Sequence, residues 1–187
     1  VHGLGGSPIV WKDTLILHCD GGDLQFIVAL DKHTGAIRWK REREHLSVDR
    51  RAGRPNVPMS YTTPLIAEVG GRMQLISAAC DYVSGLDPDS GTDLWRAHYY
   101  GYSNVAMPVV GLEMVFVSSG YDDTIFHAFS TRGEGDLTST EAWRMEKAPA
   151  LDVSPILLGD ELYLISNPGV ATCVDARSGA IHWQKRL

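Results

Sequence analysis

The stretch Ala29-Leu-Asp31-Lys-His-Thr34-Gly35-Ala-Ile-Arg-Trp39 decides the fold, because two further stretches repeat its frame. The second is Gly85-Leu-Asp87-Pro-Asp-Ser90-Gly91-Thr-Asp-Leu-Trp95, and the third is Cys173-Val-Asp175-Ala-Arg-Ser178-Gly179-Ala-Ile-His-Trp183. Each has a small residue, then Asp, then Ser or Thr followed by Gly, and finally Trp, always at the same spacing. Self-similarity at a fixed period indicates a repeat architecture. A phrase that recurs in this way is better suited to holding the fold together than to chemistry.

A proline near the start of each unit gives the same period. The prolines are Pro8, Pro64, Pro108 and Pro155, and the tryptophans that close the units are Trp39, Trp95, Trp143 and Trp183. The prolines are 56, 44 and 47 residues apart, and the tryptophans 56, 48 and 40. Units of this length are typical of propeller blades.

Within each unit, short runs rich in Val, Ile, Leu and aromatic residues are separated by Gly, Asp, Asn and Pro, which is the pattern of strands joined by turns. Four strands per unit make one blade of a β-propeller. The sequence therefore predicts an all-β fold with four blades of four antiparallel strands. We expect a single propeller segment, 1–187, with blades at about 7–41, 60–98, 104–146 and 152–187 and a connector at 42–59.

The repeated phrase has a structural explanation. The Asp side chain can accept hydrogen bonds from backbone N–H groups two or three residues on, and the Gly supplies a backbone angle that other residues avoid. The Trp can bury its ring against the neighbouring blade, where its indole N–H finds a partner. We assign this role to Ala29, Asp31, Thr34, Gly35, Trp39, Asp87, Ser90, Gly91, Trp95, Trp143, Asp175, Ser178, Gly179 and Trp183.

The third unit departs from the pattern. The stretch 128–143 keeps the small residue Ala128 and the closing Trp143, but it lacks the Asp and carries extra residues. We expect a blade with a longer loop between its third and fourth strands.

These residues resemble the tryptophan-docking repeats of the quinoprotein-like (PQQ-like) β-propellers, which include the pyrroloquinoline-quinone-dependent alcohol dehydrogenases and BamB-like proteins. The resemblance covers residues 7–187. It implies that four blades form half of an eight-bladed ring, completed by further blades of the same polypeptide or by a homodimer. It also implies a bacterial protein in a periplasmic or otherwise extracytoplasmic setting, with any lipoprotein anchor outside this chain.

The resemblance further implies a non-catalytic protein-binding or scaffold propeller, similar to BamB-type outer-membrane assembly proteins. Quinone-dependent members carry an adjacent Cys-Cys pair, a Trp floor beneath the quinone, and an Asp base beside calcium. This chain has no Cys-Cys, and its four repeat tryptophans are assigned to docking; the fifth, Trp11, could face the channel. We therefore expect no catalytic residue, cofactor or metal here. A fragment of a PQQ-dependent dehydrogenase, or a propeller that binds a ligand in its channel, remains an alternative.

Two connectors are candidates for a partner surface. The stretch 38–54 has seven basic residues against three acidic ones, and a tyrosine cluster follows the second blade. Charged loops of this kind can dock an anionic partner or simply be solvated, and the tyrosines can bind a partner or pack between blades. The candidate surface consists of Arg41, Arg43, Arg50, Arg51, Arg54, Tyr99, Tyr100 and Tyr102.

Composition narrows the function classes. The formal net charge of −6 argues against a nucleic-acid partner. No apolar run reaches the roughly 18 residues of a membrane span. The three cysteines, Cys19, Cys80 and Cys173, match no zinc spacing and are expected to be buried strand residues. Acidic pairs such as Asp87 and Asp89 are expected in turns, with bound calcium as the alternative.

Overall fold

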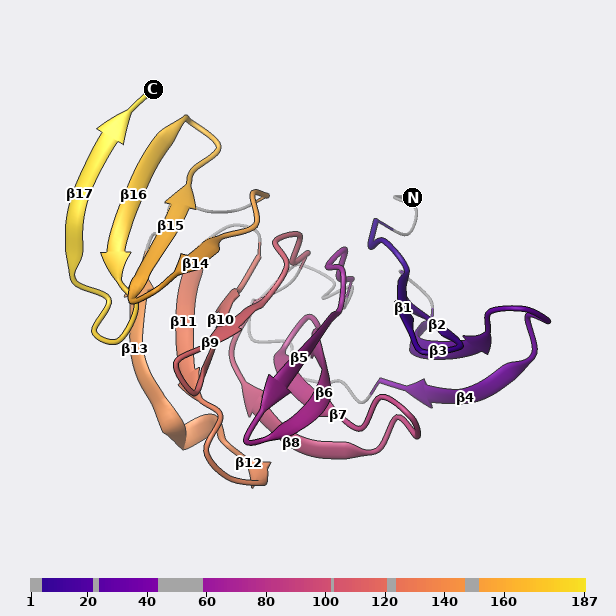
Figure 1. Ribbon diagram of the computed structural model, residues 1–187. Coiled ribbons are helices and arrows are strands. Elements are labelled where there is room, and N and C mark those ends of the chain that lie inside the picture. The colour runs from indigo at the N-terminus through magenta and orange to yellow at the C-terminus, as the bar shows by residue number, and fades with distance from the viewer. Residues whose placement is uncertain (1–4, 22–23, 44–58, 102, 121–123, 147–151) are drawn as a thin grey trace, which may run out of the picture.

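The computed structural model describes residues 5–21, 24–43, 59–101, 103–120, 124–146 and 152–187. These residues form four antiparallel sheets that follow one another along an arc (Figure 1). Blade 1 consists of β1 (Ile9–Trp11), β2 (Thr14–Asp20), β3 (Gln25–Asp31) and β4 (Ile37–Glu42). Blade 2 consists of β5 (Leu65–Val69), β6 (Arg72–Ala78), β7 (Tyr82–Leu86) and β8 (Asp93–His98).

The other two sheets have the same meander order. Blade 3 consists of β9 (Val109–Gly111), β10 (Met114–Ser118), β11 (Ile125–Ser130) and β13 (Glu141–Glu146). Blade 4 consists of β14 (Ile156–Leu158), β15 (Glu161–Ile165), β16 (Val170–Asp175) and β17 (Ile181–Arg186). The predicted all-β architecture of four four-stranded blades is therefore confirmed. None of the described residues forms a helix long and apolar enough to cross a membrane.

The hydrophobic core lies between blades rather than within one blade. One buried cluster joins Ile16 and Ile27 of blade 1 to Leu75 and Leu86 of blade 2. Two similar clusters join blade 2 to blade 3 and blade 3 to blade 4. Each sheet has a different apolar face for each neighbour, because successive side chains of a strand point to opposite sides. The buried apolar contacts that stabilise the fold therefore lie in the seams between neighbouring blades.

The small residue of the repeated phrase lies directly across the sheet from the Trp. Ala29 pairs with Trp39, and Gly85 pairs with Trp95. A Cβ at Gly85 would lie only 2.2 Å from the Trp95 Nε1 atom. In all four blades the register between the third and fourth strands shifts by a β-bulge immediately after this small residue. The small residue therefore makes room for the ring, and the bulge re-aims the strand that carries it.

The Asp and Gly of the phrase close the turn before that strand. Oδ1 of Asp31 accepts hydrogen bonds from the backbone N–H groups of His33 and Thr34, at 3.0 and 2.9 Å. The Gly35 N–H donates to the Asp31 carbonyl at 2.8 Å, with Gly35 at φ +74°. The turns that begin at Asp87 and Asp175 repeat this pattern. The Asp side chain thus replaces the backbone partners that a tight turn cannot supply.

Two glycine substitutions distinguish the effect of backbone strain in a turn from the effect of contact with a tryptophan ring of the neighbouring blade. Gly179 and Gly159 both have positive φ, +72° and +61°, so an added Cβ strains either backbone. At Gly179 the Cβ would also lie 2.7 Å from the Trp143 ring, whereas at Gly159 it would meet nothing within 4 Å. We expect Gly179→Ala to lower the free energy of unfolding by about 1–3 kcal/mol more than Gly159→Ala, as measured in urea. Equal losses would show that the tryptophan contact contributes nothing beyond the turn.

Candidate functional site

Two seams use the tryptophan in the same way. The indole Nε1 of Trp39 donates to the Pro88 carbonyl at 3.3 Å, and that of Trp143 donates to the Ala176 carbonyl at 2.9 Å. In both seams the ring lies against the Gly of the next blade's turn, so closely that a Cβ there would be 2.6 or 2.7 Å from ring carbon. Each acceptor is the residue that follows the turn Asp. These tryptophans and glycines therefore join blades and are not available for chemistry.

The seam between blades 2 and 3 departs from this arrangement. The turn in blade 3 has Ser130 where the other copies have Asp. Trp95 is 2% exposed, and its Nε1 donates to Oε1 of Gln74 in its own blade at 2.8 Å. The Gln74 Nε2 in turn donates to the Val69 carbonyl at 3.2 Å. A side-chain amide thus replaces the backbone carbonyl that the other seams provide.

The extra residues of the third unit cover this seam. They form β12 (Gly135–Asp136) and a 3₁₀ turn (Thr138–Thr140), and β12 pairs in parallel with β8 of blade 2. Leu137 donates its N–H to the Arg96 carbonyl at 2.7 Å and is only 5% exposed. The Thr138 hydroxyl accepts from the His98 N–H at 3.0 Å. The expected longer loop in this blade is confirmed, and it adds a short fifth strand to its neighbour.

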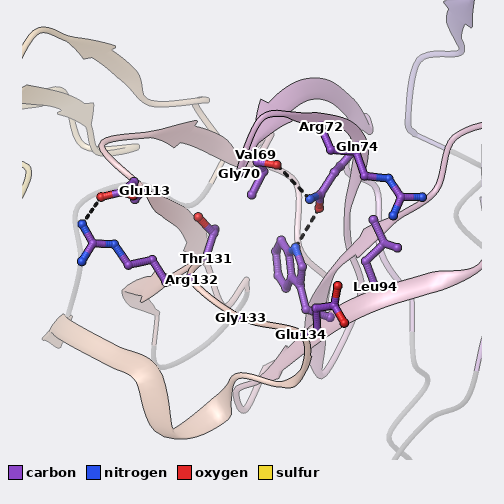
Figure 2. Close-up of a pocket in the computed structure, with 11 residues that line it drawn as sticks. Val69, Gly70, Arg72, Gln74, Leu94, Glu113, Thr131, Arg132, Gly133 and Glu134 are labelled. Carbon is purple, nitrogen blue, oxygen red and sulfur yellow. Dashed lines mark hydrogen bonds and ion pairs between the residues drawn. The ribbon is translucent and has the colours of Figure 1, made fainter.

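A cavity of about 300 Å³ lies where the regular docking turn is missing (Figure 2). Its wall includes Gln74 and Trp95 from blade 2, and Thr131 from blade 3. Two arginines lie among its lining residues and each is ion-paired: Arg132 contacts Glu113, and Arg72 contacts Asp87. The cavity therefore has both polar and apolar walls, and both of its cations already have carboxylate partners.

The structure corrects two residues of the predicted partner surface. Arg43 is buried, and its Nε and Nη2 donate to the two carboxylate oxygens of Asp20 at 2.6 and 2.8 Å. Tyr99 is buried as well; its hydroxyl donates to the Ala79 carbonyl at 2.7 Å and accepts from Asn104 at 2.8 Å. A charge cannot be buried without a partner, so the Asp20 carboxylate is what draws Arg43 inward.

The remaining members of that surface are placed differently. Arg41 is half-buried and pairs with Asp93 across the seam between blades 1 and 2. Tyr100 is partly exposed. The other four, Arg50, Arg51, Arg54 and Tyr102, lie outside the described residues. Of the described members, Arg41 and Tyr100 therefore retain solvent exposure.

A buried polar network that sequence reasoning missed lies in the seam between blades 1 and 2. His18 Nδ1 is 3.1 Å from the Thr62 carbonyl, and its Nε2 is 3.0 Å from the Ser77 hydroxyl. A carbonyl only accepts, so Nδ1 carries the proton and Nε2 accepts from Ser77. The neighbouring Asp20 Oδ2 is 3.9 Å from Nδ1 and is held by Arg43. Ser77, His18 and Asp20 are all at most 5% exposed, so this group holds the seam together and offers no route for a substrate.

The residues suggested for a cofactor or metal have structural partners. Trp11 does not face a channel: its Nε1 donates to Oδ1 of Asp89 in blade 2 at 2.9 Å. Cys80 and Cys173 are buried as expected, whereas Cys19 is only partly buried, and Cys80 lies outside the strands. Within the described ranges no group of three or more His, Cys, Asp or Glu side chains gathers as a metal site. Trp11 and Asp89 are therefore engaged in the contact between blades 1 and 2.

Comparison with known proteins agrees with this architecture. The model of the family described as outer membrane protein assembly factor BamB matches residues 2–185. The crystal structure of BamB from Moraxella catarrhalis aligns with a TM-score of 0.62 at 20% sequence identity, covering 98% of this chain and 53% of that one. The chain thus spans about half the length of this relative. No curated protein matches the chain in sequence.

Quinoprotein dehydrogenases have the same fold. Quinohemoprotein alcohol dehydrogenase from Comamonas testosteroni aligns with a TM-score of 0.69 at 11% identity, over 98% of this chain and 35% of that one. A europium-containing methanol dehydrogenase aligns with a TM-score of 0.62 at 14% identity, over 98% of this chain and 42% of that one. At these identities the likeness establishes the fold alone.

The Gln74–Trp95 hydrogen bond can be tested by a double-mutant cycle. Replacing Gln74 by Leu leaves the buried indole N–H without an acceptor, so we expect the free energy of unfolding to fall by about 1–3 kcal/mol. In a Trp95→Phe background there is no N–H to satisfy, and the same substitution should cost about 1 kcal/mol less. Urea denaturation of the four proteins gives the coupling. A coupling near zero would contradict the role of Gln74 as the hydrogen-bond acceptor for the Trp95 indole.

The histidine in the buried network should make stability depend on pH. Burial, together with the charge of Arg43, lowers the pKa of His18 well below 6.5. Below about pH 6.5 the unfolded chain binds a proton that the folded chain does not, so the stability present above this pH is lost as the pH falls. We expect a loss of up to about 1.4 kcal/mol per pH unit from this histidine, and a shallower dependence for His18→Gln in urea unfolding at pH 8 and pH 5.5. Identical pH dependence in the two proteins would refute this.

Proposed function

The chain belongs to the family of the outer membrane protein assembly factor BamB, and on that premise we propose that it is part of a non-catalytic propeller that binds other proteins outside the cytoplasm. The observation that carries the proposal is the length of the family match, residues 2–185, which leaves almost no part of the chain for a separate module.

The use of the functional side chains in the described region supports a scaffold role. The tryptophans that could stack a ligand instead donate hydrogen bonds within or across blades, as with Trp11, Trp39 and Trp143. The carboxylates of Asp31 and Asp175 accept backbone N–H groups in turns. Such residues keep the blades rigid, and a rigid propeller presents its loops to a partner.

We assign the partner surface to the basic connector, represented by Arg50, Arg51 and Arg54, together with Tyr100 and Tyr102 of the tyrosine connector. The chain is acidic overall, with a net charge of −6, so a local excess of arginine makes this connector a distinct electrostatic patch. Arginine and tyrosine are also enriched at protein interfaces. The expected partner is a protein with an acidic surface. An extracytoplasmic location, with a lipid anchor supplied from outside this chain, belongs to the same proposal.

A genetic experiment tests this function in the bacterium that carries the gene. We expect a deletion to lower the amounts of β-barrel proteins in the outer membrane and to raise sensitivity to detergents. The wild-type gene should restore both, whereas one encoding Arg50, Arg51 and Arg54 as Glu should not. The triple Lys variant is the matched control, because it retains the positive charge, and it should restore them. A deletion without effect on the outer membrane would overturn the proposal.

A quinone-dependent dehydrogenase is the second candidate, supported by the structural similarity to quinohemoprotein alcohol dehydrogenases at a TM-score of 0.69. The full-length protein, incubated with pyrroloquinoline quinone and calcium, is assayed for dye-linked alcohol oxidation. We expect no turnover above a control without quinone. Turnover that requires the quinone would favour the dehydrogenase over the scaffold.

A further inference from the structure

The cavity between blades 2 and 3 is lined by both blades and filled by neither. Its volume of about 300 Å³ lies at the lower end of the range for small-ligand sites. Three connecting segments meet around it: the β5–β6 turn of blade 2, the β9–β10 turn of blade 3, and the loop 131–134 that follows β11 (Figure 2). The cavity is therefore a surface that exists only where these two blades meet.

The charged side chains of the cavity already balance one another. Nη2 of Arg132 donates to the Glu113 carboxylate, and Nη2 of Arg72 donates to the Asp87 carboxylate. Glu134 adds an exposed carboxylate to the lining. An anionic ligand would meet these three carboxylates, and a cationic ligand would lie beside two guanidinium groups. The pattern of charge therefore favours an uncharged ligand.

Hydrogen-bonding groups lie beside apolar surface in the same lining. The buried Gln74 amide donates one N–H to the Val69 carbonyl and accepts from the Trp95 indole, which leaves one N–H and one lone pair of the amide. Thr131 is also buried, and its hydroxyl can both donate and accept. Leu94 and Trp95 contribute carbon surface. The cavity thus offers donors, acceptors and apolar contact to one small molecule.

The β9–β10 turn places Glu113 at the cavity at a cost in backbone energy. Leu112 and Glu113 have φ of +57° and +59°, which residues with a side chain adopt only under strain. Blade 2 has Gly70 and Gly71 in the corresponding turn. The pair between Glu113 and Arg132 is exposed, and an exposed ion pair stabilises a fold very little. Stability alone therefore does not account for a glutamate at this position.

We propose that this cavity binds a neutral hexose between blades 2 and 3. Sugar hydroxyls donate to carboxylates and accept from amide, hydroxyl and guanidinium groups, while the C–H groups of the ring pack against apolar side chains. Such a ligand displaces no ion from its partner. This inference does not rest on the proposed function, because none of the residues that line the cavity belongs to the partner surface assigned above.

Titration of the full-length protein with D-glucose, D-galactose and D-mannose tests the site. The tryptophans are labelled with ¹⁵N, and the Trp95 indole signal is identified by its loss in Trp95→Phe. We expect at least one hexose to shift this signal with a dissociation constant on the order of 1 mM, while the indole signals of Trp39 and Trp143 stay in place. A Trp95 signal that none of the three sugars moves, at concentrations roughly 100-fold higher, would overturn the proposal.

Charged analogues of the same ring test the preference for a neutral ligand. The uronic acid and the 2-amino sugar that correspond to the best-bound hexose should each bind about 5-fold or more weakly than the hexose. Glu134→Gln removes a charge but keeps hydrogen-bonding groups, so it should leave hexose binding within about 3-fold of the wild type. Tighter binding of the amino sugar, lost in Glu134→Gln, would contradict the proposal, because the cavity would then select a cation.

Two substitutions in the lining separate ligand binding from stability. Thr131→Val replaces the hydroxyl by a methyl group of similar size and should raise the hexose dissociation constant roughly 10-fold. Glu113→Gly removes the carboxylate and relieves the strained φ, so the dissociation constant should rise by about the same factor while resistance to urea is retained. Unchanged hexose affinity in both variants would place the sugar elsewhere and overturn the proposal.

Discussion

The structure depends on one interaction, an indole ring laid flat over a glycine of the neighbouring blade. Because that Gly has no Cβ, the ring of Trp39 or Trp143 can approach the backbone of the next blade and donate to its carbonyl. The turn Asp, the β-bulge and the small residue opposite the ring all serve this approach. Each blade alone is a small sheet with two apolar faces, and the seam makes it part of a stable body.

The seam between blades 2 and 3 shows what the interaction requires when one partner is lost. Without the turn Asp and its following glycine, the Trp95 N–H still needs an acceptor, and Gln74 supplies it. The surface that the docking turn would have covered is partly covered by Leu137 and β12. A side-chain amide thus satisfies the indole N–H in place of a backbone carbonyl, and a cavity remains where the regular turn would lie.

Most of the fold could be predicted from the sequence, because each residue of the repeated phrase has a recognisable structural role. The Asp forms a turn, the Gly adopts positive φ, and the Trp follows at a fixed number of residues. The placement of the partner surface could not be predicted. Arg43 follows a run of exposed basic residues, and only the three-dimensional pairing with Asp20 explains its burial. The network around His18 was equally hidden, since its members come from residues 44 and 59 positions apart in the chain. Local patterns reveal strands and turns, but not which polar groups meet across a seam.

The irregular seam also has a genetic consequence. Blades that share the tryptophan–glycine joint could in principle be duplicated, deleted or reordered by recombination between repeats without loss of that joint. Blades 2 and 3 are different, because β12 of one belongs to the sheet of the other. They can be inherited only as a pair. The strand contributed by the third blade thus fixes the order of these two blades relative to each other.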